Sequence, residues 1–309
     1  MDETFRAEAL AGLRASPKRT SPKWFYDDEG SALFERITHL DAYYPPRLER
    51  EAFERALPAV GERLGGAAVA EFGSGSSRKT RALIEAVRPV LYVPLDIAEG
   101  FLMEAAERLR ADVPGLDVHP VAADFTQEVV LPDAFRAARR RLGFFPGPTI
   151  GNFDAGGAEA FLRRAHGTLG AGEAGEAAFL VSADLVKDEA VMVLAYDDPG
   201  GMTAAFNRNL LVRMNRELGA DFDPTHFRHE ARWNAGDSRI EMHLVSALPQ
   251  TVTVAGERFA FAEGESIHTE NSHKYTRDGF GALADRAGWR VAEVWTDASD
   301  GFGVFLLTG

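Results

Sequence analysis

The fold of this chain is decided by residues 67–80, which read AAVAEFGSGSSRKT. The apolar run over residues 67–72 predicts a buried β-strand, and the periodicity of residues 78–88 predicts a helix after it. Between them, Gly73 and Gly75 let the backbone approach a ligand, while the N-terminus of the following helix offers unpaired N–H groups. A strand, a glycine loop and a helix in this order indicate a ligand-binding α/β fold.

Downstream of this loop the alternation of strand and helix continues. Strands are expected over residues 91–95, 118–122, 144–150 and 176–183, with helices over residues 99–111, 134–142 and 157–169. Such alternation with short loops is typical of a parallel, doubly wound sheet. After a helix over residues 277–287, the strands at 290–296 and 303–308 resemble a hairpin that ends the sheet with an antiparallel strand.

The alternation is interrupted over residues 187–273. A helix is expected at 201–219, followed by strands at 227–233 and 238–246 and by a hairpin, TVTVAGERFAF, at 251–261. The sheet therefore carries an insertion.

An unusual density of aromatic side chains follows a short amphipathic helix predicted over residues 2–14. The residues are Trp24, Phe25, Tyr26, Phe34, Tyr43 and Tyr44. The sequence leaves two interpretations open for them, a packed cap over a domain core and a surface that faces a ligand.

Composition excludes several classes of function. The 309 residues carry 34 basic and 47 acidic side chains, a balance of −13 that argues against binding to nucleic acid. The absence of cysteine excludes a thiol nucleophile, a CxxC redox pair and cysteine-ligated zinc. No run approaches the roughly 20 apolar residues of a membrane span, and the N-terminus lacks the pattern of a signal peptide. A cytoplasmic protein without membrane partners is expected.

Three classes of ligand compete for the glycine loop. A dinucleotide fingerprint and a P-loop both require glycine where this chain has Arg78. A nucleoside without a pyrophosphate fits better, because Glu71 opens the loop and Asp96 ends the second strand, 21 residues after Gly75. At that spacing a carboxylate meets ribose hydroxyls in nucleotide-binding α/β folds. With Asp124-Phe125 at the end of the third strand, the pattern predicts an S-adenosylmethionine pocket.

Longer motifs resemble one family. The segment PKWFYDDEGSALFERITHLDAYYPPR, at 22–47, is similar to the start of the histidine-specific SAM-dependent methyltransferases that make hercynine, the ergothioneine precursor. The likeness continues in order through EFGSGSSRKT (71–80), FFPGPTIGNF (144–153), AYDDPGGMTAAFNRNLL (195–211) and TENSHKY (269–275). It covers nearly the whole chain.

The resemblance implies a fold of two domains. One is a class I SAM-methyltransferase domain with a Rossmann-like doubly wound sheet, predicted over 48–186 and 274–309. The other is a discontinuous α+β domain for substrate recognition, predicted over 1–47 and 187–273.

The resemblance also implies roles for single residues. Gly73, Gly75 and Lys79 would line the methyl-donor site, with Asp96 at the ribose and Asp124 and Phe125 at the adenine. Asn152 and Tyr196 would hold the carboxylate of the substrate, and Tyr43 and Tyr26 would lie near its amine as the catalytic residues. Glu270 and Ser272 would bind the imidazole, with Met242 packed beside it.

The implied reaction is successive transfer of methyl groups from S-adenosylmethionine to the α-amino nitrogen of L-histidine, performed by a monomer. One alternative is the same chemistry on another aromatic amino acid or amine, since only three residues define the side-chain pocket. A P-loop-like nucleotide hydrolase and a catalytically silent metabolite-binding protein are further alternatives.

Histidines are candidate metal ligands. His226 and His229 lie three residues apart, and His268 stands two positions before Glu270, without a dense cluster of acids and histidines around them. We therefore expect structural histidines and no metal site.

Overall fold

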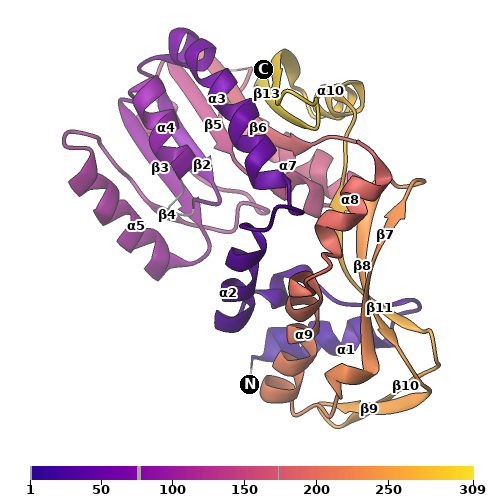
Figure 1. The fold of residues 1–309 in the computed structure, drawn as a ribbon. Coiled ribbons are helices and arrows are strands. Elements are labelled where there is room, and N and C mark those ends of the chain that lie inside the picture. The colour runs from indigo at the N-terminus through magenta and orange to yellow at the C-terminus, as the bar shows by residue number, and fades with distance from the viewer. Residues whose placement is uncertain (1, 75–77, 173) are drawn as a thin grey trace. The chain divides into compact units, whose positions relative to one another are not determined.

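The computed structural model describes residues 2–74, 78–172 and 174–309. The chain forms two compact units (Figure 1). We call Pro45–Val186 with Lys274–Gly309 the sheet unit, and Met1–Tyr44 with Lys187–His273 the insertion unit.

The sheet unit contains a seven-stranded sheet in the order β12-β13-β6-β5-β2-β3-β4. Its strands are β2 (Ala68–Phe72), β3 (Leu91–Asp96), β4 (Val121–Ala122), β5 (Arg140–Phe145), β6 (Glu176–Asp184), β12 (Arg290–Thr296) and β13 (Phe302–Thr308). The first five pair in parallel, whereas β13 runs antiparallel to both β6 and β12. The predicted hairpin at the end of a parallel sheet is confirmed.

Helices cover both faces of this sheet, as a doubly wound fold requires (Figure 1). One face packs against α3 (Pro45–Leu64), α4 (Arg78–Val87) and α5 (Glu99–Asp112). The other packs against α7 (Ala155–Thr168) and α10 (Arg277–Arg286). Because successive strand residues point to opposite faces, Val69 enters the first core while Ala68 and Ala70 enter the second. The predicted fold class is confirmed.

The predicted basic helix over residues 134–142 is wrong. Helix α6 spans only Asp133–Arg136, and β5 begins at Arg140, so the strand predicted from residue 144 starts earlier. Residues 142–145 are buried in the sheet and draw the preceding arginines into the strand. Arg141, 2% exposed, donates from Nη2 to the carbonyls of Gly170 and Ala174 at 3.1 Å each, so this arginine is anchored inside the sheet unit.

The insertion unit is built on a four-stranded sheet in the order β1-β11-β8-β7, with a separate β9–β10 hairpin. Its strands are β1 (Lys18–Arg19), β7 (Phe227–Asn234), β8 (Arg239–Ser246), β9 (Gln250–Val254), β10 (Glu257–Phe261) and β11 (Ser266–His273). Its helices are α1 (Glu3–Arg14), α2 (Asp28–Ile37), α8 (Glu189–Tyr196) and α9 (Met202–Leu218). The predicted hairpin and the strands before it are confirmed, whereas the sequence did not predict β11.

The N-terminal segment joins the insertion through side chains of α9. Asp27 accepts from Asn209 Nδ2 at 2.8 Å and from Arg216 at 2.6 Å. Phe206 stacks on Phe25 with ring centroids 4.6 Å apart. Most of the aromatic cluster noted in the sequence is therefore the core of this unit, which favours the first interpretation, while Tyr26 keeps 43% of its surface exposed.

The helices differ from membrane spans in length and composition. In the described ranges, no helix combines the length and the apolar composition that crossing a bilayer requires.

Candidate active site

The carboxyl ends of β2, β3 and β4 lie side by side in the sheet unit. Phe72 is in register with Leu95, and Asp96 with Ala122. The N–H groups of Gly73 and Ser74 both donate to the Leu95 carbonyl at 2.9 Å, which turns the glycine loop toward the end of β3. Ala122 ends β4 just before Asp124, so the parallel register brings the residues predicted for the methyl donor to one edge of the sheet.

The backbone conformation at position 73 favours glycine. Its φ of +76° lies in the left-handed region, which other residues adopt at a cost. A Cβ there would stand 3.5 Å from Cε1 of Phe125, so the loop and the Phe125 ring are neighbours. Phe125 is half-buried against Phe72 and Phe145. Gly75, also predicted for the donor site, lies outside the described residues.

Asp96 and Asp124 each use one carboxylate oxygen to hold their own loop. Oδ1 of Asp96 accepts from the N–H of Ala98 at 2.9 Å. Oδ1 of Asp124 accepts from the N–H of Thr126 at 2.8 Å and from its hydroxyl at 2.6 Å. These bonds orient both carboxylates at the sheet edge, where each has a second oxygen.

Beneath the glycine loop, Glu71 is fully buried. Its carboxylate accepts from Thr80 Oγ1 at 2.9 Å and from the Tyr92 hydroxyl at 2.8 Å, and that hydroxyl lies 3.1 Å from Ser74 Oγ. Burial raises the pKa of Glu71 to about 7, against the lowering effect of these hydrogen bonds and of Lys79. Glu71 thus supports the loop from below, with Thr80 and Tyr92 as partners that the sequence did not single out.

Lys79 forms an ion pair that the sequence did not predict. Its Nζ lies 2.7 Å from Oε2 of Glu49, which is 2% exposed. Oε1 of Glu49 accepts from the N–H of Gly147 at 2.6 Å. Glu49 therefore links the first turn of α4 to the loop after β5, and the predicted contact of Lys79 with the donor stays a prediction.

Asn152 ends a 3-10 helix, η2 (Pro148–Asn152), and its side chain is exposed. Gly147, with a φ of +81°, allows the backbone to enter this turn. The Tyr275 hydroxyl stabilises the turn by donating to the Ile150 carbonyl at 3.2 Å. Tyr275, which the sequence motifs leave without a role, supports this turn.

In the insertion unit, the predicted substrate residues are joined by a chain of aromatic rings. Ring centroids are 5.5 Å apart for Tyr26 and Phe34, 6.2 Å for Phe34 and Tyr43, and 5.8 Å for Tyr43 and Tyr196, all edge to face. Edge-to-face contacts are a preferred geometry for aromatic pairs. Residues from α2, the loop after it and α8 therefore meet in one cluster.

The chain of rings ends on β11. The Tyr196 hydroxyl lies 2.7 Å from Ser272 Oγ, and both residues are buried. Two further predicted residues, Met242 and Glu270, are directly opposite each other on β8 and β11. Cross-strand partners share a face of the sheet, so these side chains belong to one surface.

Glu270 also acts on the tyrosines through its charge. Desolvation, the Glu270 carboxylate and the hydroxyls of Tyr43 and Tyr196 raise the pKa of Tyr26 well above its usual value of 10. Glu270 thus acts on a phenol that keeps 43% of its surface exposed. Tyr26 is therefore a neutral phenol at physiological pH.

His229 supports Tyr196 from below and was not predicted to do so. Its Nε2 lies 2.7 Å from the Tyr196 carbonyl, which only accepts, so this nitrogen carries the proton. Nδ1 lies 2.8 Å from Nδ2 of Asn207 and accepts from it. Burial lowers the pKa of His229, which keeps the ring neutral in this tautomer. The end of α8 is thereby fixed.

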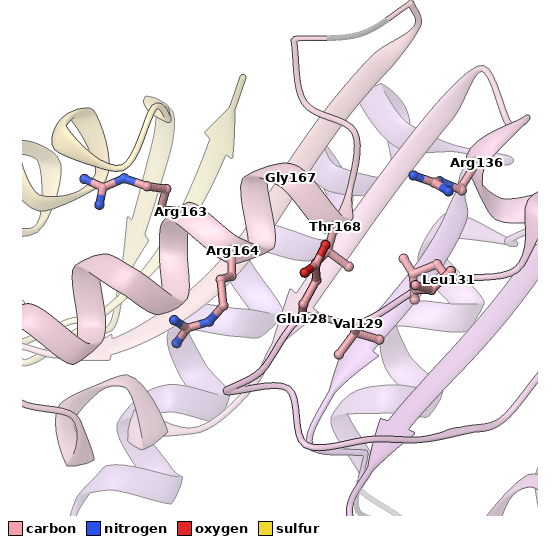
Figure 2. Close-up of a pocket in the computed structure, with 9 residues that line it drawn as sticks. Glu128, Val129, Leu131, Arg136, Arg163, Arg164, Gly167 and Thr168 are labelled. Atoms are coloured by element: carbon pink, nitrogen blue, oxygen red, sulfur yellow. The ribbon is translucent and has the colours of Figure 1, made fainter.

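A separate cavity of 320 Å³ lies in the sheet unit, beside the C-terminal end of α7 (Figure 2). Residues 128–131, Arg136, Arg163 and Arg164 are among those that line it. Arg163 is already paired with Glu159 at 2.6 Å. None of the predicted site residues that the structure describes lines this cavity, so it is not part of the candidate site.

Residues 5–309 match a family described as histidine-specific methyltransferase, SAM-dependent. The histidine N-alpha-methyltransferase of Mycolicibacterium smegmatis is 40% identical over 310 residues, covering 98% of this chain and 94% of that protein. The histidine N-alpha-methyltransferase of Mycobacterium tuberculosis is 39% identical over 307 residues, covering 97% and 94%.

Among solved structures, an S-adenosylmethionine-dependent methyltransferase from Clostridium acetobutylicum aligns with a TM-score of 0.47 and 11% identity. The alignment covers 91% of this chain and 97% of that one, but the likeness is too distant to carry an argument.

Proposed function

The chain belongs to the histidine-specific, SAM-dependent methyltransferase family, and on this premise we propose which residues perform the reaction. It transfers methyl groups from S-adenosylmethionine to the α-amino nitrogen of L-histidine. We propose that three successive transfers give the trimethylated product, hercynine. The predicted residues divide between the units: all those proposed for the donor lie in the sheet unit, and all those for histidine except Asn152 lie in the insertion unit.

One observation carries the assignment of the histidine site. Tyr26, Tyr43, Tyr196, Met242, Glu270 and Ser272 come from distant parts of the chain and meet within the insertion unit. Their chemistry suits the substrate, because an ionised Glu270 accepts from one imidazole nitrogen and a hydroxyl such as that of Ser272 serves the other. Asn152 and Tyr196 are proposed to donate to the carboxylate.

The sheet unit fits the donor. When bound, S-adenosylmethionine supplies an electrophilic methyl group on sulfur. Gly73 leaves backbone accessible beside Phe125, and the carboxylates of Asp96 and Asp124 stand at the same sheet edge. We propose that Asp96 accepts from ribose hydroxyls, and that Asp124 and the Phe125 ring bind the adenine. We propose that Lys79, held by its ion pair with Glu49, also lines the donor site.

The main task of the chain's own residues is to orient the amine. A neutral amine is already a nucleophile, and holding it in line with the methyl group provides much of the rate. Tyr43 and Tyr26 are proposed to receive its N–H groups on their hydroxyl oxygens. The raised pKa of Tyr26 argues against a phenolate base, so this residue acts by position. Aromatic faces also attract the cation that forms as methylation proceeds.

Mass spectrometry of the purified protein with S-adenosylmethionine and histidine tests the reaction. Mono-, di- and trimethylated histidine are expected, and their absence would overturn the proposal. Competition between histidine, tryptophan and tyrosine tests the alternative substrate class. Preferred methylation of another aromatic amino acid would reassign the pocket formed by Met242, Glu270 and Ser272.

Glu270→Ala tests the imidazole site. Histidine affinity is expected to fall about tenfold or more, because a charge-assisted hydrogen bond is lost, while donor affinity stays unchanged. Glu263→Ala, an exposed glutamate of the same unit, is the matched control. Equal losses for both ligands would contradict the assignment.

We also propose that the protein acts as a cytoplasmic monomer, since both ligands are small diffusible molecules. Light scattering of the purified protein measures the mass, and a dimer would refute this part.

A further inference from the structure

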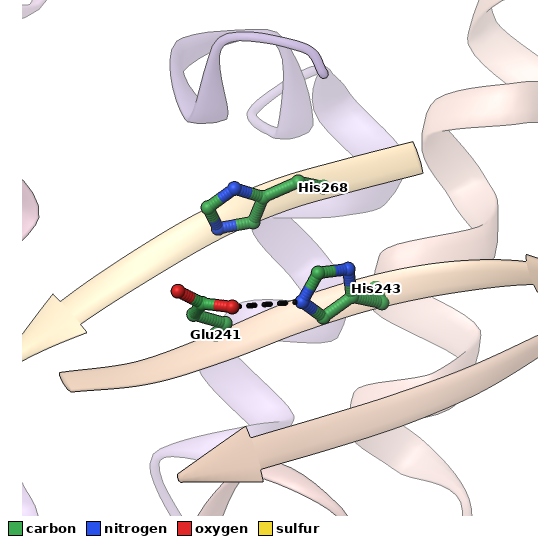
Figure 3. Close-up of side chains that lie close together, drawn as sticks. All are labelled: Glu241, His243 and His268. Atoms are coloured by element: carbon green, nitrogen blue, oxygen red, sulfur yellow. Dashed lines mark hydrogen bonds and ion pairs between the residues drawn. The ribbon is translucent and has the colours of Figure 1, made fainter. Parts of the chain in front are cut away.

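Two histidines and a glutamate converge on the sheet of the insertion unit (Figure 3). Glu241 and His243 lie on β8, and His268 lies directly opposite His243 on β11. One potential ligand atom from each residue lies within 4.8 Å of the other two. The expectation that no cluster of acids and histidines surrounds His268 is therefore wrong, because strand pairing brings Glu241 and His243 of β8 beside it.

This cluster faces away from the proposed histidine site. Side chains alternate along β8, so Met242 points to the opposite face from Glu241 and His243. The register shifts between His268 and Glu270, so that His268 pairs with His243 while Glu270 pairs with Met242. The bulge thus separates the three clustered residues from the residues assigned to the substrate, and the chemistry of the cluster is independent of that assignment.

We propose that Glu241, His243 and His268 bind a divalent transition metal of the zinc class. Imidazole nitrogen and carboxylate oxygen are ligands that zinc accepts, with water completing the set. His243 Nε2 lies 3.1 Å from Glu241 Oε2. Two ligands at zinc distances in a tetrahedron are about 3.3 Å apart, so this pair already has the spacing of a coordination edge.

Outer hydrogen bonds orient two of the three ligands. Glu241 Oε1 accepts from Arg239 Nε at 2.8 Å and from Asn234 Nδ2 at 2.9 Å, which turns Oε2 toward His243. His243 Nδ1 lies 3.2 Å from Ser266 Oγ, so Nε2 is directed at Glu241. Ligating carboxylates and imidazoles are usually held in this way by outer partners.

His268 completes the set by a modest movement. Its ring stacks on His243 with centroids 4.9 Å apart, and its Nε2 lies 3.1 Å from the Glu270 carbonyl. Coordination through Nε2 requires the half-buried ring to turn toward Glu241 and to give up its contact with that carbonyl.

The cations near the cluster are already engaged. Arg239 is paired with Asp237 and Glu241, and Arg232 with Glu230. Arg19, in register with His268, is exposed. Two of these arginines are thus paired with acids outside the cluster, Arg239 with Asp237 and Arg232 with Glu230.

Zinc titration of the full chain by calorimetry, with metal content measured by mass spectrometry, tests the proposal. The wild-type protein is expected to bind one Zn²⁺, and His268→Gln and His243→Gln are each expected to weaken that site by more than about tenfold. His119→Gln is the matched control, because His119 also lies 2.8 Å from an acid, Asp117, but belongs to no group of three potential metal ligands among the described residues. It should leave the site unchanged.

Co²⁺ provides a second readout, since the visible absorption of a low-symmetry Co²⁺ site should appear in the wild type and vanish in Glu241→Gln. Circular dichroism confirms that each variant is folded. Absence of zinc binding by the wild type, or equal weakening by His119→Gln and His268→Gln, would overturn the proposal.

Discussion

The sheet unit and the insertion unit build their proposed sites in different ways. In the sheet unit, the donor residues follow the ends of three adjacent parallel strands within about fifty residues of sequence, and a glycine loop and two carboxylates shape the edge. In the insertion unit, six side chains from distant segments meet through aromatic contacts and one buried hydroxyl pair. The first site depends on backbone topology, and the second depends on side-chain packing.

This difference predicts that a change in one unit alters the affinity for one ligand only. The largest effect on stability is expected for Lys79→Met in the sheet unit. Removing the ammonium leaves the buried Glu49 carboxylate without its ion pair, which should lower the free energy of unfolding by about 3 kcal/mol, at the lower end for such pairs because Lys79 is partly exposed. Denaturant unfolding measures it.

The double variant Lys79→Met, Glu49→Gln is the control. It removes both charges and should recover much of the lost stability. If the single variant remains as stable as the wild type yet loses donor affinity, Lys79 binds the donor directly and its structural role is wrong.

A slightly smaller effect is expected from the titration of Glu71. Its pKa is about 7 when folded and near 4.5 when unfolded, so the folded state binds more protons between these values. Stability contributed by this group is present below pH 4.5 and is lost as pH rises through 7, by up to about 3 kcal/mol. Glu71→Gln should remove this part of the pH profile, as thermal unfolding from pH 5 to 8 would show.

For Glu241 of the insertion unit, the expected dependence of stability on pH has the opposite sign. Its pKa of about 2 is depressed, so its contribution is present above pH 4.5 and is lost as pH falls toward 2. In metal-free buffer at pH 7, Glu241→Gln should destabilise the protein. Glu71→Gln should stabilise it at the same pH. Changes of the same sign would refute the assigned environments.

A further prediction concerns His229. His229→Ala leaves the buried Tyr196 carbonyl and Asn207 amide without this partner and should cost about 2 kcal/mol of stability. Because the end of α8 is released, the KM for histidine should rise several-fold with little change in donor affinity. His229→Gln, which keeps an N–H donor, should recover part of the loss. Equal defects in both variants would show that an N–H donor at this position is not what holds the Tyr196 carbonyl.

The smallest effect is expected for Tyr196→Phe. The ring contact with Tyr43 remains, while the buried hydroxyl pair with Ser272 is lost, at a cost of about 1 kcal/mol. Histidine affinity should fall by up to about tenfold and donor affinity should not change. A double-mutant cycle with Ser272→Ala measures the coupling, and strictly additive losses would argue that the two hydroxyls act independently.

Local patterns in the sequence were sufficient to predict the doubly wound sheet, its closing hairpin and the place of the insertion. They were also sufficient to indicate a nucleoside-bearing donor, because strand ends and glycine loops can be recognised from residues that are neighbours in the sequence. The substrate residues came from a resemblance in longer motifs, which no local pattern replaces. The error at residues 134–142 has a simple cause, since the run of arginines hid a strand whose burial depends on its neighbours in the sheet.

The sequence by itself determined the alternation of elements, the acidic charge, the absence of thiol chemistry and the family to which the chain belongs. Only the tertiary structure decided which side chains are partners. Glu49 with Lys79, His229 with Tyr196, and His243 with His268 are separated by between 25 and 33 residues, and nothing local in either member of a pair predicts the other. A one-residue shift in strand register, at the bulge before Glu270, decides which side chains share a face of the sheet with Met242 and which lie on the opposite face. Pairings of this kind arise from long-range packing, so they exist only in the folded chain.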